Sequence, residues 1–247
     1  MSKARKLKVI SLFSGAGGLD LGFHGAGFEV AVCVEADTAC CDTLRKNWPD
    51  TPVLLGDIRE ISTKEILNVA KLSPLEPALV IGGPPCQPFS LAGKRQGFQD
   101  TRGTLFMEFV RVIRETLPVA FVMENVKGLK NWNGGQALET ILKELSDPFL
   151  FEGKEYRYTV VHDCLNAVDY GVPQKRERVF FVGTRNEKQF VFPDPTHFPP
   201  EMLNGIGEKW KTVNDALRLL PQPDAPSATA QRVSKTIRER HKKCGYE

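Results

Sequence analysis

The chain has 247 residues, with 33 Lys and Arg against 30 Asp and Glu, and its hydrophobic content of 41% is typical of a globular protein. The formal net charge of +3 is too small to indicate nucleic-acid binding by itself. The apolar runs are too short to span a bilayer, and no signal peptide is recognisable, so we expect a cytosolic protein and exclude a membrane protein.

The first half alternates short β-branched or apolar runs with segments of helical periodicity, a pattern typical of β-α-β units in a parallel sheet. Between the last two of its strands, apolar residues recur at spacings of three and four from Phe106 to Leu117, which predicts a helix that Pro118 ends. The chain is therefore expected to form a doubly wound, mostly parallel α/β sheet. Its predicted strands are 9–13, 30–34, 53–55, 78–81, 120–123, 158–161 and 179–182.

The composition changes after residue 185. Seven prolines between residues 193 and 226 interrupt any regular pattern, and a basic stretch at 232–243 has weak helical spacing. We therefore expect one folded domain over residues 1–185 and a loop-rich region over residues 186–247.

A glycine-rich loop, Phe-Ser-Gly-Ala-Gly-Gly at 13–18, follows the first predicted strand and precedes a helical segment. Glycines in such a turn let the backbone approach a ligand closely, although a merely tight connection is the alternative. Glu35 ends the second strand, where an acidic residue can accept hydrogen bonds from ribose hydroxyls. Asp20 replaces the last glycine of the dinucleotide pattern, so a nucleoside cofactor without a pyrophosphate fits better than NAD or FAD.

The most informative segment is 82–90, Gly-Gly-Pro-Pro-Cys-Gln-Pro-Phe-Ser, at the carboxyl end of the fourth strand, where open α/β sheets bind ligands. Prolines on both sides of Cys86 exclude regular structure and hold this cysteine in a stiff, extended loop. A free cysteine is usually a small buried hydrophobe, and that interpretation suits the other five. No cysteine pair has the spacing of a metal site. We predict that the Cys86 thiolate is a nucleophile.

Charged residues lie next to the ends of three other predicted strands. Asp57 lies where a carboxylate would reach an adenine amino group, although such an aspartate often caps a turn or helix. Glu124 is expected one strand from Cys86, where burial would favour its protonated form; a salt bridge is the alternative. Arg176 and Arg178 fall on one side of an extended segment and suit carbonyl or phosphate oxygens, unless they are only solvated.

In their order along the chain and in their amino-acid sequence, these segments resemble the DNA cytosine-5 methyltransferase family, of the bacterial restriction–modification type, over residues 8–185. The resemblance rests on the glycine loop, Glu35, Asp57, Pro-Pro-Cys-Gln-Pro-Phe-Ser, Glu-Asn-Val and Gln-Lys-Arg-Glu-Arg. It implies a Rossmann-like, S-adenosylmethionine-dependent methyltransferase that needs no metal, acts on duplex DNA in the bacterial cytosol and flips its target base. Residues 1–185 would then be the catalytic and cofactor-binding domain.

The resemblance also implies roles for individual residues. Cys86 would attack cytosine C6, Glu124 would act at N3, Arg178 would donate to O2, and Arg176 would support the loop. The remaining predictions concern the cofactor, with Glu35 at the ribose, Asp57 and Ile58 at the adenine, and Pro85 and Leu105 near the methionine. The residues of the glycine loop expected to contact the cofactor are Phe13, Ala16, Gly17 and Gly18. For the DNA, the side chains expected to hold phosphates during base flipping are Lys94, Arg95 and Arg102.

The chain departs from the family after residue 185. The target-recognition region and the Gly-Asn-Ser-Val segment that completes the cofactor lobe have no counterpart, and residues 186–247 resemble only the start of a recognition or docking region. We expect either the larger chain of a two-chain enzyme, whose second polypeptide supplies these parts, or a shortened form of a longer chain. The alternative functions are an RNA cytosine methyltransferase and an inactive DNA-binding or regulatory subunit. The joint presence of Cys86, Glu124 and Arg178 argues against an inactive subunit.

Overall fold

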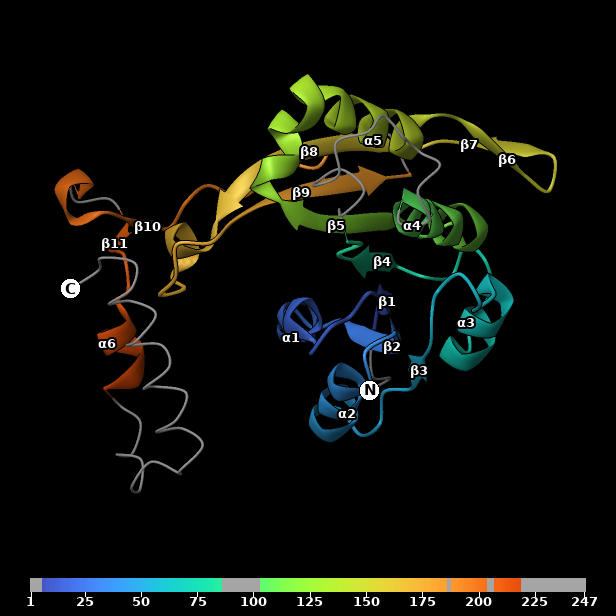
Figure 1. Cartoon of the computed structure of the whole chain (residues 1–247), viewed down its shortest axis with the longest axis horizontal. Helices are drawn as coiled ribbons and strands as arrows, with labels where there is room; N and C mark the ends of the chain where they lie inside the picture. The colour runs from blue at the N-terminus through green and yellow to red at the C-terminus, as the bar shows by residue number, and fades with distance from the viewer. Residues whose placement is uncertain (1–5, 86–102, 186–187, 204–206, 219–247) are drawn as a thin grey trace, which may run out of the picture.

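The computed structural model describes residues 6–85, 103–185, 188–203 and 207–218 (Figure 1). The strands of its main sheet are β1 (Lys8–Leu12), β2 (Glu29–Glu35), β3 (Val53–Leu55), β4 (Leu79–Gly82), β5 (Ala120–Val126), β8 (Thr159–Asn166) and β9 (Glu177–Thr184). They form a seven-stranded sheet in the order β3-β2-β1-β4-β5-β9-β8. Neighbouring strands from β3 to β5 are parallel, whereas β9 is antiparallel to both β5 and β8. The prediction of a doubly wound, mostly parallel sheet is confirmed.

Helices cover both faces of the sheet. In Figure 1, α1 and α2 lie on one face of the strands β1 to β3, and α3 and α4 lie on the other. A 3-10 helix, η2, and α5 cover the part of the sheet formed by β8 and β9. The bounds are α1 (Gly18–Gly25), α2 (Thr38–Asn47), α3 (Thr63–Ala70), α4 (Gly103–Thr116), η2 (Lys127–Gly135) and α5 (Gln136–Ser146).

The core follows from the apolar runs seen in the sequence. Val9, Ile10 and Leu12 in β1 are completely buried, as expected for a central parallel strand that is covered on both faces. On α4, Phe109 and Ile113 are buried on the face predicted from the periodicity. The helix ends at Thr116, before Pro118, because proline cannot continue the hydrogen-bond ladder. All seven predicted strands are present. The strand at 53–55 has its predicted bounds, and the ends of the other strands shift by at most five residues.

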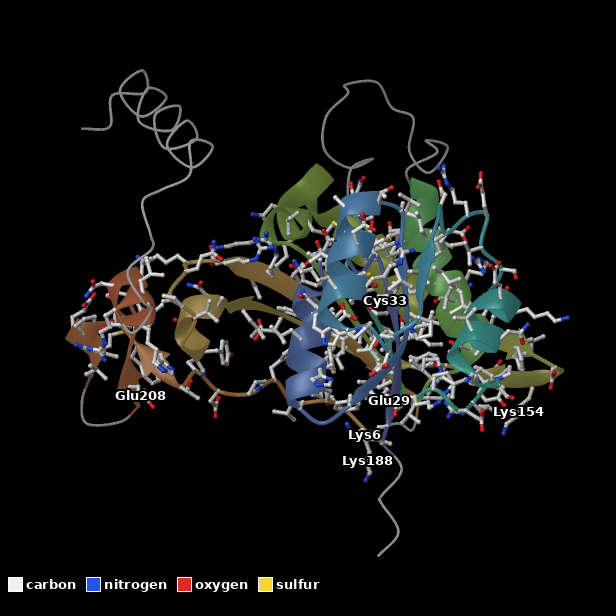
Figure 2. The ribbon with its side chains drawn as sticks, turned by 90° about the horizontal axis from the view of Figure 1, so that it is seen from below. Lys6, Glu29, Cys33, Lys154, Lys188 and Glu208 are labelled. Atoms are coloured by element: carbon white, nitrogen blue, oxygen red, sulfur yellow. The ribbon has the colours of Figure 1, made fainter. Side chains whose placement is uncertain are left out.

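Two small additions were not predicted. A hairpin of β6 (Phe149–Phe151) and β7 (Lys154–Tyr156) is too short to give a clear alternation of apolar and polar residues. In the second addition, β10 (His197–Phe198) pairs with β11 (Glu208–Lys209) and contacts the 3-10 helix η3 (Ala167–Tyr170). The two additions lie at opposite ends of the molecule, as the positions of Lys154 and Glu208 show (Figure 2).

The region after residue 185 is short of regular structure where it is described. It contains β10, β11, the 3-10 helix η4 (Pro200–Met202) and α6 (Val213–Leu217), which is capped by the Thr212 side chain. The basic stretch predicted to be helical at 232–243 lies outside the described residues, and the division at residue 185 stays a prediction. Among the described helices, none has the length and apolar character needed to cross a bilayer.

Candidate active site

A cavity of about 510 Å³ lies at the carboxyl ends of β1, β4 and β5, beside the beginning of β9. This volume falls within the range of roughly 300–1,000 Å³ that is usual for small-molecule sites. Parallel strands place their carboxyl ends at one edge, so residues far apart in sequence meet there. The residues that line the cavity include Phe13, Gly18, Gly82, Glu124, Arg176 and Arg178.

The glycine loop at 13–18 forms a tight turn between β1 and α1. Gly17 has a φ of +86°, and a Cβ atom there would lie 2.3 Å from the Trp48 ring. Only glycine therefore meets both the backbone and the packing requirement at this position. Glu35, at the end of β2, accepts a hydrogen bond of 2.7 Å from the backbone N–H of Gly15. The predicted ribose acceptor thus also holds the loop in place.

The end of β4 packs closely against its neighbours as it leads toward Cys86. A Cβ atom at Gly82 would lie 2.5 Å from the Leu12 carbonyl oxygen, so a side chain there would separate β4 from β1. The buried side chain of Asn125 donates a hydrogen bond of 3.1 Å to the carbonyl of Pro84. Asn125 therefore fixes the main chain two residues before Cys86. The Glu-Asn-Val motif was the sequence signal for this residue, but the motif had suggested a role only for its glutamate.

Glu124 and Arg178 form an ion pair on the wall of the cavity. The distance from Arg178 Nε to Glu124 Oε1 is 2.9 Å, and about a quarter of each side chain is exposed. Glu124 lies on β5 and pairs in register with Phe180 of β9, two positions from Arg178. Side chains two residues apart on a strand share a face, so the arginine can reach across to the carboxylate. The salt bridge that the sequence left as an alternative for Glu124 is therefore present.

Arg176 also lines the cavity, and its backbone N–H donates to the Asn166 side chain at 3.0 Å. The structure thus brings Arg176 together with Glu124, Arg178, Phe13 and Gly18. The nucleophile predicted from the sequence, Cys86, lies outside the described residues, and so do the three cations that flank it, Lys94, Arg95 and Arg102.

Several predicted cofactor residues do not line this cavity. Asp57 pairs with Arg59, whose Nε lies 2.9 Å from Asp57 Oδ1, and the hydrogen bonds from Arg59 lower the pKa of Asp57. Ile58 is buried in the core, and Leu105 is half-buried against it on α4. The other predicted residues absent from the cavity wall are Ala16, Gly17, Glu35 and Pro85.

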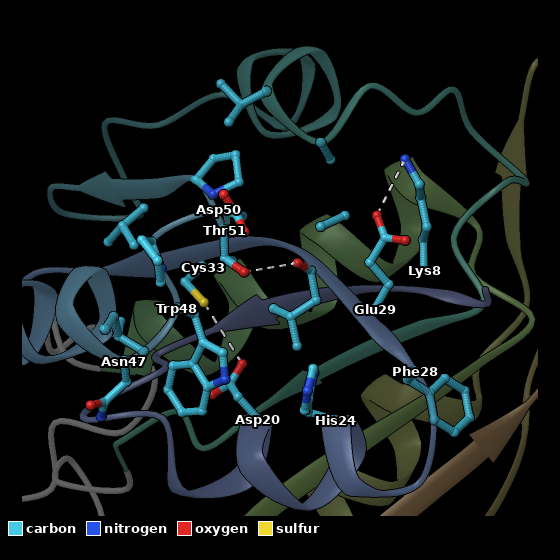
Figure 3. A pocket seen from close by; sticks show the side chains of 18 of the residues that line it. Lys8, Asp20, His24, Phe28, Glu29, Cys33, Asn47, Trp48, Asp50 and Thr51 are labelled. Atoms are coloured by element: carbon cyan, nitrogen blue, oxygen red, sulfur yellow. Dashed lines mark hydrogen bonds and ion pairs between the residues drawn. The ribbon is translucent and has the colours of Figure 1, made fainter. Parts of the chain in front are cut away.

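A buried carboxyl beneath the loop had not been predicted as a site residue. Asp20, in the first turn of α1, is 2% exposed, and its Oδ2 atom has no hydrogen-bond partner. Burial raises the pKa of Asp20 and, together with the nearby carboxyl, raises the pKa of Cys33 to about 12. Asp20 lines both the site and a second cavity of about 560 Å³, whose wall includes Cys33 and Trp48 (Figure 3).

Comparisons with known proteins identify the family. Residues 7–245 match the family described as C-5 cytosine-specific DNA methylase. The chain is 58% identical to the type II methyltransferase M.AquIA of Picosynechococcus over 97% of this chain and 99% of that protein. It is 39% identical to the type II methyltransferase M.SacI of Streptomyces achromogenes over 90% of this chain and 60% of that longer protein.

A solved structure agrees with this match. It is described as a DNA modification methyltransferase encoded within a prophage of E. coli, and it superposes with a TM-score of 0.67 at 32% identity. The superposition covers 89% of this chain and 56% of that one, so this chain spans little more than half of that relative. The chain therefore belongs to the C-5 cytosine-specific DNA methylase family and is a DNA cytosine-5 methyltransferase of the bacterial restriction–modification type.

Proposed function

We propose that this chain transfers a methyl group from S-adenosylmethionine to C5 of cytosine in duplex DNA, through a covalent bond between Cys86 and C6. The observation that carries the proposal is the Glu124–Arg178 pair on the cavity wall, 2.9 Å apart. Glu124 lies on β5, and β5 pairs directly with β4, which leads into the Cys86 segment. A carboxyl and a guanidinium beside that segment suit N3 and O2 of one pyrimidine ring.

The ends of three adjacent parallel strands suit a nucleoside cofactor. The glycine loop follows β1, Glu35 ends β2 and Asp57 follows β3, and neighbouring strands lie about 4.8 Å apart. A carboxylate offers about four acceptor positions. Glu35 uses three of them, for the backbone N–H groups of Gly15, Ala36 and Asp37, which leaves one for a ribose hydroxyl.

When bound, S-adenosylmethionine would supply an electrophilic methyl carbon at this edge of the sheet. The glycine loop would contact the cofactor, Pro85 and Leu105 would lie near its methionine part, and Asp57 and Ile58 would hold the adenine. Asp57 accepts hydrogen bonds from Arg59 on both carboxylate oxygens, so the adenine amino group would need a remaining lone pair or a displaced arginine. Only part of the hydrogen-bonding capacity of the Asp57 carboxylate is therefore free for the adenine.

The residues of the pyrimidine site would solve one chemical difficulty, which is that C5 of cytosine is a poor nucleophile. Addition of the Cys86 thiolate to C6, with a proton or hydrogen bond from Glu124 at N3, makes C5 enamine-like and able to accept the methyl group. Loss of the C5 proton and departure of the Cys86 sulfur then restore the aromatic ring. Arg178 would hold O2 during these steps, and Arg176 would support it.

The duplex must also open, because C6 is inaccessible inside stacked base pairs. Extrusion of the base costs a few kcal/mol, and basic side chains can hold the backbone phosphates meanwhile. Lys94, Arg95 and Arg102 are proposed for this task from the sequence alone.

The test uses the full chain, a labelled methyl donor and duplex DNA. We expect label on cytosine C5. When the target base is 5-fluorocytosine, we expect a protein–DNA adduct that is stable to denaturing detergent, because C5 then carries fluorine in place of the proton that must be lost to release the enzyme. Duplex RNA of the same sequence and Cys86→Ala serve as controls. Equal transfer to RNA would favour the alternative of an RNA methyltransferase, and an adduct with Cys86→Ala would contradict the proposed nucleophile.

The predicted second polypeptide finds no support in the comparisons, because M.AquIA aligns over 99% of its own length. The prediction can be tested directly. Sequence-specific methylation should be measured for the purified chain with and without the product of a neighbouring reading frame. Full, specific activity of the chain alone would contradict the need for a second chain.

A further inference from the structure

Arg111, on α4, joins that helix to the segment between β3 and α3. Its Nη2 atom donates to the carbonyl oxygens of Ile58 and Ile61, both at 3.1 Å, and its Nη1 atom donates to the Thr63 hydroxyl at 2.6 Å. These three acceptors come from a stretch without strand or helix hydrogen bonds until Thr63 begins α3. One side chain therefore supplies several of the donors that fix this stretch.

The guanidinium is itself held in one orientation by its own helix. Glu108, three residues earlier, accepts from Nε at 2.6 Å, and Glu115, four residues later, lies 3.6 Å from Nη1. About a quarter of the Arg111 side chain is exposed. A planar guanidinium can serve all these acceptors at once, whereas the single ammonium of lysine cannot.

The stretch that Arg111 holds begins next to Asp57. Ile58, whose carbonyl accepts from Arg111, directly follows Asp57 in the chain. The Ile58 and Ile61 side chains are buried. Water cannot easily replace a donor at carbonyls beside such buried side chains. Without the arginine, the backbone after Asp57 would lose two of the hydrogen bonds that set its direction, those at the Ile58 and Ile61 carbonyls.

We propose that Arg111 is a positioning residue for the cofactor, which acts by holding Asp57 at the edge of the sheet where the adenine amino group would bind. The proposal rests on the proposed adenine role of Asp57. Arg111 itself touches neither the cofactor nor the DNA; it orients the backbone of the residue that does. Its loss should therefore reduce cofactor affinity through Asp57 and leave the pyrimidine chemistry of Glu124 unchanged.

Arg114 offers a matched control on the same helix. Its Nη2 atom donates to the Glu144 carbonyl at 2.9 Å, and its guanidinium lies 5.5 Å from the centre of the Phe149 ring. Its side chain is 31% exposed, close to the 26% of Arg111. Arg114 thus joins α4 to α5 and β6, away from Asp57, with bonds of the same kind.

The experiment measures the dissociation constant of S-adenosylmethionine by calorimetry and the melting temperature for the full chain and its variants. We expect Arg111→Met to weaken binding by roughly tenfold, the scale of losing a hydrogen bond to a charged group. Arg111→Lys should recover little of that loss. Arg114→Met should change affinity by less than about twofold even where it lowers the melting temperature as much.

A double-mutant cycle with Asp57→Ala separates positioning from general destabilisation. If Arg111 acts through Asp57, then Arg111→Met should cost much less affinity when Asp57 is already alanine. Equal losses in both backgrounds, equal losses in Arg111→Met and Arg114→Met, or unchanged affinity in Arg111→Met would each overturn the proposal. If Arg111→Met does not fold, Arg111→Lys and Arg111→Gln complete the same cycle.

Failure of the proposed function gives a different pattern. A wild-type chain that does not bind S-adenosylmethionine would contradict the proposed cofactor. Normal binding by Asp57→Ala would contradict the adenine role on which the inference rests. Weakened binding by Asp57→Ala with normal binding by Arg111→Met would contradict the positioning role alone.

Discussion

Arg178 and Glu124 meet across two antiparallel strands, with Arg178 Nε 2.9 Å from Glu124 Oε1. The strand register offsets the two residues by two positions, which puts their side chains on one face of the sheet. Each side chain keeps about a quarter of its surface exposed, on the wall of the cavity. The pair can therefore present a carboxyl group and a fixed cation to the same ring.

Replacement of Glu124 by Gln should reduce kcat by at least roughly a hundredfold, the usual scale for losing general-acid assistance. The amide keeps the shape and can still bond to N3, but it cannot transfer a proton. Initial rates of methyl transfer at saturating DNA and cofactor measure the effect. Glu29→Gln, which removes a charge that pairs with Lys8 at 4.0 Å, is the control. A loss below threefold for Glu124→Gln would identify its ion pair as purely structural.

The variant Cys86→Ala should abolish methyl transfer while S-adenosylmethionine affinity stays within about twofold of the wild type, because most of the proposed cofactor contacts lie at or just after the ends of β1, β2 and β3. Calorimetry gives the affinity, and label incorporation gives the rate. Cys164→Ala, in β8, changes a half-buried thiol that was predicted to be inert and should keep full activity. Turnover by Cys86→Ala would refute the nucleophile assignment.

The variant Asn125→Ala should slow the reaction without changing cofactor affinity. It removes the hydrogen bond of 3.1 Å to the Pro84 carbonyl and leaves that buried acceptor without its donor. The Cys86 loop would then be positioned less accurately, and misplacement of a reacting group can be costly. Adduct formation with 5-fluorocytosine DNA, followed over time, measures the step. An unchanged rate of adduct formation would show that Asn125 does not position the loop.

The variant Glu35→Ala should weaken S-adenosylmethionine binding more than Glu35→Gln does. Alanine removes both the proposed ribose acceptor and the acceptor for the Gly15 N–H, whereas the Gln carbonyl can retain one of them. Calorimetry on both variants measures the difference. Unchanged affinity in Glu35→Ala would count against the ribose assignment.

The stability of the protein should depend on pH through Asp20. Burial raises the pKa of Asp20 above its usual 3.8, so the folded state favours the protonated carboxyl. The stabilisation is fully present below 3.8 and is lost as pH rises through the folded-state pKa. Asparagine stays neutral, so Asp20→Asn should melt at a higher temperature than the wild type at alkaline pH.

Thermal unfolding of Asp20→Asn and wild type across a pH series checks this sign. The difference in melting temperature should shrink as pH falls and vanish once both side chains are neutral. Asp42→Asn, whose side chain is 70% exposed, is the control and should show little difference. A lower melting temperature for Asp20→Asn at alkaline pH would mean that the carboxylate has a partner that stabilises it.

The sequence by itself determined the strands and the order of the motifs. β-Branched runs in β1, β2 and β4 had to become buried strands, because only a sheet covered on both faces hides such continuous apolar segments. Once the strands were parallel, their carboxyl ends had to share an edge. The sequence alone therefore predicts that the motifs following β1 to β5 lie near one another.

Only the tertiary structure decided how distant segments meet. Insertion of β9 between β5 and β8 brings Arg178 to Glu124, which lies 54 residues earlier in the chain (178 − 124). The contacts of Arg111 with Ile58 and the orphaned oxygen of Asp20 have no local signature either. Such features depend on which faces pack together and on which donors remain within reach, and local periodicity carries no information about either.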